Sequence, residues 1–208
     1  MSSVSSEIIV ACLLVLGGYF ILTARAVKST KRSDSRIWNL VHNGLMLLGY
    51  VLAYPTIQLG PLSVRFLPES PVFEIIGVVL VVAGVAFAIW ARRILGADWS
   101  GTVTIKTGHR LVRSGPYAIV RNPIYTGDIV IVLGMAVALG AISGFLGLAL
   151  MVAAVWHKGR TEERFLLAEF GDEYADYQRE VGFLLPRLLP RVSSRGSVRE
   201  AGQDERSR

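Results

Sequence analysis

The sequence predicts an all-α, polytopic integral membrane protein, and three observations support that prediction. Of its 208 residues, 52% are hydrophobic and only 18% are charged, whereas a soluble domain carries about a quarter charged residues. Apolar runs about long enough to cross a bilayer recur along the chain. Basic residues collect in alternate polar segments between those runs. Together these features predict about five transmembrane helices.

The predicted spans are apolar runs with at most isolated charged residues. They cover residues 8–24, 38–60, 72–91, 124–141 and 142–157. In the third span, Gly77 and Gly84 are small enough to allow close contact between helices. The last two spans are short and separated by glycine, so they predict a helical hairpin that crosses the membrane and returns.

The basic residues predict the orientation of these spans. Lys and Arg number 22: 5 lie in 25–36, 1 in 60–71, 6 in 92–121 and 10 from Lys158 onward. With the N-terminus outside and the C-terminus in the cytoplasm, the groups of 5, 6 and 10, or 21 of the 22, fall on the inner side, the pattern of inner membrane loops. This distribution also argues against a nucleic-acid partner, because the charges do not line one soluble face. Arginine supplies 18 of the 22, which favours a GC-rich bacterial source and a bacterial cell membrane.

The chain divides into three predicted regions. Residues 1–95 form a three-span membrane region, and residues 96–190 hold a polar loop, the hairpin and an amphipathic helix. The helix is expected over 161–181, because Leu166, Phe170, Tyr174, Tyr177 and Val181 recur at helical spacing. Residues 191–208 have the composition of a disordered tail.

The segment from Lys106 to Gly127 is the main candidate for a functional site. It is basic, it contains turn residues at Gly115-Pro116 and Asn122-Pro123, and an apolar span follows it directly. Turns leave backbone groups free to bind a ligand. Tyr117 and Tyr125 offer ring faces for a purine or a sulfonium cation.

Charged residues beyond the hairpin complement this loop. Glu162 and Glu163 could bind a ligand ammonium or sulfonium, whereas Arg121, Lys158 and Arg160 could bind carboxylates. Two adjacent glutamates at a helix start also have a structural interpretation, since they favour the positive end of the helix dipole. Asp128, just inside the hairpin, is expected to reach the interface or a polar cavity. The three histidines lack metal-site spacing, so no metal is predicted.

Four motifs in order resemble the isoprenylcysteine carboxyl methyltransferase family, which consists of integral membrane enzymes that use S-adenosylmethionine and is related to phospholipid N-methyltransferases. The motifs are H-R-L-V, G-P-Y, R-N-P-I-Y-T-G and R-T-E-E-x-F-L-L-x-x-F-G-D-E-Y-x-x-Y, and they fall within residues 98–186. The resemblance implies S-adenosylmethionine as cofactor and a lipid or lipid-modified acceptor. It implies a cofactor site that consists of His109, Arg110, Leu111, Val112, Tyr117, Asn122, Pro123, Ile124, Tyr125 and Glu162.

Two positions depart from the family pattern. Asn122 stands where the family usually has histidine, so this position can form hydrogen bonds but cannot serve as an acid. The arginine that faces the substrate carboxylate in eukaryotic members is matched most closely by Lys158, with Arg160 two residues away. The residues predicted to be catalytic are therefore Arg121, Lys158, Arg160 and Glu163.

Methyl transfer at the inner membrane face, with a carboxylate acceptor, is the function these features favour. An amine acceptor would need a general base, for which Glu162, Glu163 and His157 are available. Two rival functions are an NADPH-dependent sterol-type reductase and a non-enzymatic scaffold that binds lipid. The sequence does not determine the oligomeric state.

Overall fold

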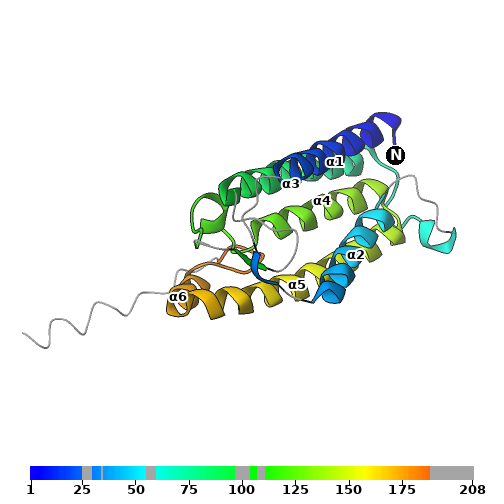
Figure 1. Cartoon of the computed structure of the whole chain (residues 1–208). Helices are drawn as coiled ribbons and strands as arrows, with labels where there is room; N and C mark the ends of the chain where they lie inside the picture. The colour runs from blue at the N-terminus through cyan, green and yellow to red at the C-terminus, as the bar shows by residue number, and fades with distance from the viewer. Residues whose placement is uncertain (25–29, 34, 55–59, 97–103, 107–110, 188–208) are drawn as a thin grey trace, which may run out of the picture.

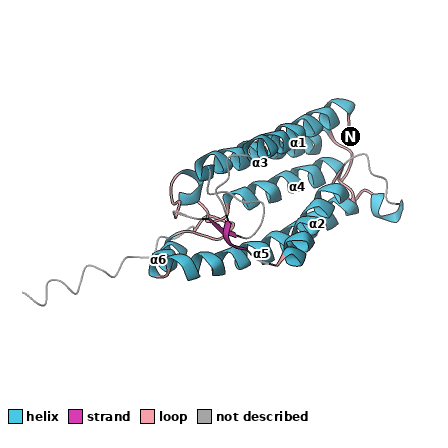
Figure 2. Ribbon diagram, viewed as in Figure 1, coloured by secondary structure: helices cyan, strands magenta, loops and turns pink. Residues whose placement is uncertain are grey.

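The structure is a computed structural model that describes residues 1–24, 30–33, 35–54, 60–96, 104–106 and 111–187. Most of these residues are helical (Figures 1 and 2). The helices are α1 (Ser3–Ala24), α2 (Arg36–Leu52), α3 (Pro71–Leu95), α4 (Pro123–Leu139), α5 (Ile142–Phe170) and α6 (Asp172–Glu180), with short 3-10 turns η1 (Gly60–Ser63) and η3 (Gly115–Ala118). Two short strands, β1 (Thr30–Ser33) and β2 (Thr104–Lys106), form an antiparallel pair that the sequence did not predict.

The predicted all-α membrane fold is confirmed. Helices α1, α3 and α5 are long and apolar enough to cross a membrane, and α2 and α4 are shorter apolar helices among the described residues. Large apolar side chains such as Leu14, Leu22, Leu40 and Ile75 are exposed on the outside of the bundle. A bilayer would cover such side chains, since water disfavours a surface of this kind.

The long helices pack in the spatial order α1, α3, α4, α5, α2 (Figure 1). Helices α3 and α4 approach most closely through glycine. A Cβ on Gly77 would lie 2.5 Å from the Gly134 carbonyl oxygen, and one on Gly84 would lie 2.9 Å from that of Gly127. The predicted role of Gly77 and Gly84 in close helix contact is therefore confirmed.

The predicted hairpin is present, with different helix ends. Helix α4 ends at Leu139, where the capping residue Gly140 has the left-handed φ of 68°, and α5 begins at Ile142. The loop that precedes α3 covers this turn, because the backbone N–H groups of Phe66 and Leu67 both donate to the Gly140 carbonyl.

Two predicted boundaries are wrong. The second span was expected over 38–60, yet α2 ends at Leu52, as a helix should shortly before Pro55. The amphipathic helix expected over 161–181 is instead two pieces. Residues up to Phe170 continue α5, and Gly171, with a φ of 53°, ends that helix before α6 begins. The predicted tail, 191–208, lies outside the described residues.

Candidate active site

The start of α4 is fixed to the segment that follows α6 by backbone hydrogen bonds. The Arg121 N–H donates to the Gly182 carbonyl at 2.8 Å, and the Asn122 N–H donates to the Phe183 carbonyl at 3.2 Å. Pro123 occupies the first turn of α4, where its missing N–H has no cost. The Asn122 amide also points toward Phe183, at 3.5 Å from its carbonyl. The R-N-P motif thus forms a junction between α4 and residues 181–185.

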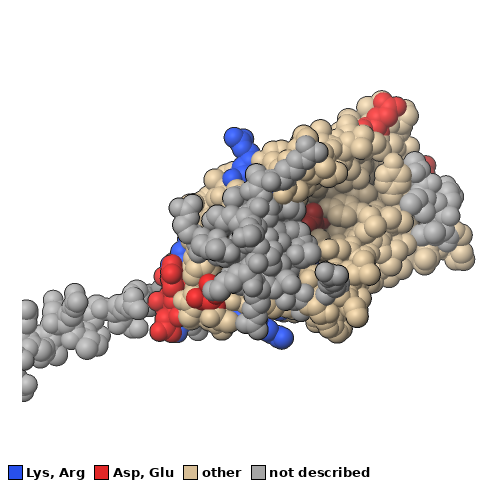
Figure 3. Space-filling model, viewed as in Figure 1, with Lys and Arg blue, Asp and Glu red and all other residues tan. Residues whose placement is uncertain are grey.

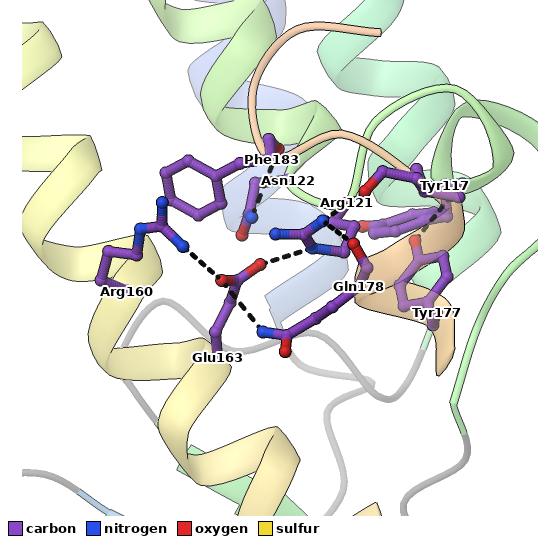
Figure 4. A network of polar contacts seen from close by, with 9 residues as sticks. Tyr117, Arg121, Asn122, Arg160, Glu163, Tyr177, Gln178 and Phe183 are labelled. Atoms are coloured by element: carbon purple, nitrogen blue, oxygen red, sulfur yellow. Dashed lines mark hydrogen bonds and ion pairs between the residues drawn. The ribbon is translucent and has the colours of Figure 1, made fainter. Parts of the chain in front are cut away.

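An ion-pair network with a buried Arg121–Glu163 pair at its centre lies next to this junction (Figure 4). The Arg121 Nε donates to Glu163 Oε1 at 2.6 Å, and the two side chains are only 6% and 4% exposed. The other Glu163 oxygen accepts hydrogen bonds from Arg160 at 3.2 Å and from the Gln178 amide at 3.3 Å. Arg121 also donates to the carbonyl oxygens of Gln178 and Val181. Three residues predicted to be catalytic therefore lie together, and within the described residues they bind one another and the region around the end of α6.

The two glutamates do not stand at a helix start. Glu162 and Glu163 lie in the interior of α5, so the helix-dipole interpretation is wrong for both. They also point to different partners, since residues adjacent in a helix differ by about 100° in direction. Glu163 faces the network above, and Glu162 faces α4.

A second polar cluster joins α4 and α5. The Tyr125 hydroxyl donates to Glu162 Oε1 at 2.8 Å. The Lys158 ammonium lies 5.6 Å from the centre of the Tyr125 ring and donates to Asn43 Oδ1 of α2 at 2.7 Å. Lys158 is only 4% exposed. Polar and charged side chains buried inside a membrane bundle are costly, and they commonly mark a functional site.

Tyr117 lies next to this cluster in η3. Its side chain is buried, and burial together with the Glu162 carboxylate raises the pKa of its phenol. Its carbonyl accepts a hydrogen bond at 2.6 Å from Tyr177, whose own pKa is raised by burial. Both phenols therefore stay protonated at neutral pH. The predicted residues Leu111, Val112 and Ile124 are half-buried, whereas His109 and Arg110 lie outside the described residues.

Asp128 is a polar residue that the sequence pattern alone did not mark as functional. It lies three residues after Tyr125 on α4, so the two share a face. Its Oδ1 accepts a hydrogen bond from the Tyr50 hydroxyl of α2 at 2.7 Å. Figure 3 shows acidic atoms at the bottom of a hollow, and the part of its rim that the structure describes is drawn in the colour of uncharged residues. A charged residue inside an apolar helix was the signal that could have identified Asp128.

Comparison with known proteins agrees with the motifs. A family model described as phospholipid methyltransferase matches residues 72–173. Protein-S-isoprenylcysteine O-methyltransferase from Schizosaccharomyces pombe is 36% identical over 101 residues, which are 46% of this chain and 41% of the relative. The protein of the same name from Saccharomyces cerevisiae is 29% identical over 118 residues, 54% of this chain and 48% of the relative.

A bacterial relative carries a different name. The cobalt-zinc-cadmium resistance protein CzcN from Cupriavidus metallidurans is 34% identical over 84 residues, 40% of this chain and 38% of the relative. The chain thus spans less than half the length of each of these three relatives. Residues 72–173, which hold α3 except its first residue and the whole of α4 and α5, are thus the part of the chain that matches the isoprenylcysteine carboxyl methyltransferase and phospholipid methyltransferase group of membrane proteins.

Proposed function

We propose that this chain transfers a methyl group from S-adenosylmethionine to a lipid-like or prenylcysteine-type acceptor, with a carboxylate as the favoured acceptor group. The observation that carries the proposal is the cluster of Tyr125, Glu162 and Lys158 between α4 and α5. This cluster lies within the segment that matches the methyltransferase family. It contains a carboxylate and an aromatic ring, and both suit a sulfonium cofactor.

The donor set of the cluster suits S-adenosylmethionine. Glu162 provides a carboxylate for a cationic group, and the Tyr125 and Tyr117 rings provide faces for a sulfonium or a purine. Leu111, Val112 and Ile124 would add apolar contact, and His109 and Arg110 are proposed to complete the site. When bound, the cofactor supplies an electrophilic methyl carbon on a positively charged sulfur.

A carboxylate acceptor needs no proton transfer. It is ionised near neutral pH, so its oxygen can form the new bond to the methyl carbon while the bond from that carbon to sulfur breaks. The electron pair of the broken bond stays on sulfur, which becomes neutral. Lys158 would hold the carboxylate, as an ammonium can without the two-pronged geometry of arginine. Catalysis then depends mainly on alignment and exclusion of water.

The ion-pair network is proposed to position the site. Arg121, Arg160 and Glu163 fix residues 181–185 against the start of α4, and α4 carries Asn122, Pro123 and Tyr125. The hollow in Figure 3 supports lateral entry of a lipid chain from the bilayer. An apolar acceptor and a water-soluble cofactor could then meet at the inner membrane face.

An amine acceptor is the second candidate, because Lys158 has two acidic neighbours. Glu162 and Asp128 both act electrostatically on the Lys158 ammonium, which reduces the attraction left for an acceptor carboxylate. Either acid could instead receive the proton that an ammonium must lose before methylation. The name of the matching family model, phospholipid methyltransferase, is consistent with an amine acceptor.

Methyl transfer from a radiolabelled cofactor tests the proposal and separates the two candidates. Detergent-purified protein is incubated with a farnesylcysteine derivative or with phosphatidylethanolamine, and the product is treated with base, which hydrolyses methyl esters and leaves methylamines intact. We expect base-labile label on the prenylcysteine, lost in Glu162→Gln and retained in the matched control Glu180→Gln, whose glutamate is exposed on α6. Base-stable label on the phospholipid would instead establish N-methylation. Absence of label on either acceptor, from protein that binds the cofactor, would contradict both acceptor assignments.

A further inference from the structure

The C-terminal half of α5 carries an exposed stripe, in which Arg160 is also part of the ion-pair network described above. Trp156, Arg160, Arg164 and Leu167 recur at spacings of 4, 4 and 3, so they lie along one side of the helix. Trp156 is 50% exposed and Leu167 is 41% exposed. The Arg160 side chain is 43% exposed, and Arg164 is exposed as well.

This stripe faces away from the proposed methyl-transfer site. Lys158 and Glu162 are four residues apart and share the face of α5 that meets α4. Arg160 and Arg164 each follow one of them by two residues, which turns them by about 200° around the helix axis. A ligand on the stripe would therefore bind apart from the Tyr125 cluster.

A shallow pocket of about 440 Å³ lies on the stripe. Its walls come from α5 and α6, and its lining residues are Arg160, Glu163, Arg164, Leu167 and Gln178. Glu163 is engaged by Arg121 and Arg160, whereas Arg164 forms no ion pair or hydrogen bond among the residues that the structure describes. The two arginines outweigh the single acid of the lining, so the pocket suits an anion.

Aromatic rings hold the first of these arginines in place. The Arg160 guanidinium lies 4.7 Å from the centre of the Trp156 ring and 4.4 Å from that of Phe183. Stacking of this kind orders a guanidinium and leaves nitrogens at its edge available for an oxygen acceptor. Arg160 is thus fixed beside Arg164 before any ligand arrives.

We propose that this pocket binds the phosphate of an anionic phospholipid from the surrounding bilayer. A lipid fits better than a soluble phosphate, because exposed Trp156 and Leu167 stand at the two ends of the arginine pair. Tryptophan is enriched where the hydrocarbon region of a membrane meets its headgroups, and arginines next to a span attract anionic headgroups. The lipid would fix the extension of α5 at the membrane surface.

Energy transfer from tryptophan to dansyl-labelled phosphatidylglycerol tests this proposal in a neutral detergent. The test variant is Arg164→Gln, which removes a charge without breaking a described contact. The matched control is Arg93→Gln, since Arg93 is likewise exposed at the end of a membrane helix, α3, that runs parallel to α5. Dansyl-labelled phosphatidylcholine gives the signal of a lipid without net charge, and thermal unfolding shows that each variant is folded.

We expect wild type and Arg93→Gln to bind phosphatidylglycerol more tightly than phosphatidylcholine, with Arg164→Gln about fivefold weaker for the anionic lipid. Inorganic phosphate at millimolar concentration should not displace the lipid. Equal binding of phosphatidylglycerol by both variants would show that the lipid responds only to the overall surface charge of the protein and not to this pocket, and would overturn the proposal. Displacement by inorganic phosphate would overturn it in favour of a soluble phosphate ligand. Neither result depends on methyltransferase activity.

Discussion

Two adjacent residues of α5 have different roles, one next to the proposed ligand site and one in an ion pair that holds the fold together. Glu162 and Glu163 are neighbours in sequence, yet Glu162 accepts a hydrogen bond from Tyr125 and Glu163 forms a buried ion pair with Arg121. The first lies beside Tyr117 and Lys158, where a ligand could bind. The second joins α4, α5 and the segment after α6.

Breaking the Arg121–Glu163 pair should destabilise the fold. Glu163→Gln leaves the Arg121 charge buried without its counter-ion, which costs about 3–5 kcal/mol for a buried pair. We expect a large fall in the unfolding temperature of the detergent-purified protein, and no change in the exposed control Glu180→Gln. The double variant Arg121→Leu/Glu163→Leu should recover part of the loss, because it removes both charges. A Glu163→Gln variant as stable as wild type would show that the pair is unimportant for the fold.

At the scale of helices, glycine decides how closely α3 and α4 pack. Gly77 and Gly84 face α4, and a Cβ on either would overlap backbone atoms there. In a bilayer, where apolar side chains gain little by leaving lipid, such close backbone contact is a main source of helix association.

Gly77→Ala should therefore destabilise the bundle. Its new Cβ would lie 2.5 Å from the Gly134 carbonyl oxygen, and such overpacking typically costs about 1–3 kcal/mol. Gly44→Ala on α2 is the control, since a Cβ there meets nothing within 4 Å. Thermal unfolding of both variants in detergent measures the difference. Equal unfolding temperatures of the two variants would mean that α3 and α4 can move apart without loss of stability.

The positions of individual helices could be predicted well where the sequence has a long apolar run or a clear helical periodicity. The apolar runs identified all the long helices, and the R-N-P and E-E motifs identified residues that the fold brings together. Pro55 and Gly171 were visible in the sequence, but the length of the apolar run and the aromatic spacing outweighed them, which led to two wrong boundaries. The partners of Asp128 and Glu163 could not be predicted, because Tyr50 and Arg121 lie 78 and 42 residues away in the chain.

At the scale of the whole molecule, the spatial order α1, α3, α4, α5, α2 explains how distant segments form one polar cluster. Helix α2 is separated from α1 by three other helices in this order, yet its Asn43 and Tyr50 reach Lys158 and Asp128. Helix α2, which lies outside the family motifs, therefore contributes to the polar cluster.

The predicted orientation is testable on the intact chain. In a Cys12→Ser background, Glu69→Cys places a thiol in the loop before α3, at a side chain that is 79% exposed. Arg187→Cys places one after α6, where the side chain is also exposed. We expect a membrane-impermeant maleimide to label Glu69→Cys on intact cells and Arg187→Cys only after the cells are opened. The reverse pattern would invert the topology and move the proposed site to the outer face.

A calorimetric titration of the detergent-purified protein with S-adenosylhomocysteine tests directly whether the cluster of Tyr125, Glu162 and Lys158 binds the cofactor. Wild type is compared with Glu162→Gln, which removes the charge beside Tyr125, and with Glu180→Gln as a matched control. We expect wild type and the control to bind, and binding by Glu162→Gln to be weaker by at least about tenfold, or about 1.4 kcal/mol. Absence of binding by folded wild type, or equal binding by all three proteins, would contradict the assignment of the Tyr125–Glu162–Lys158 cluster as the cofactor site.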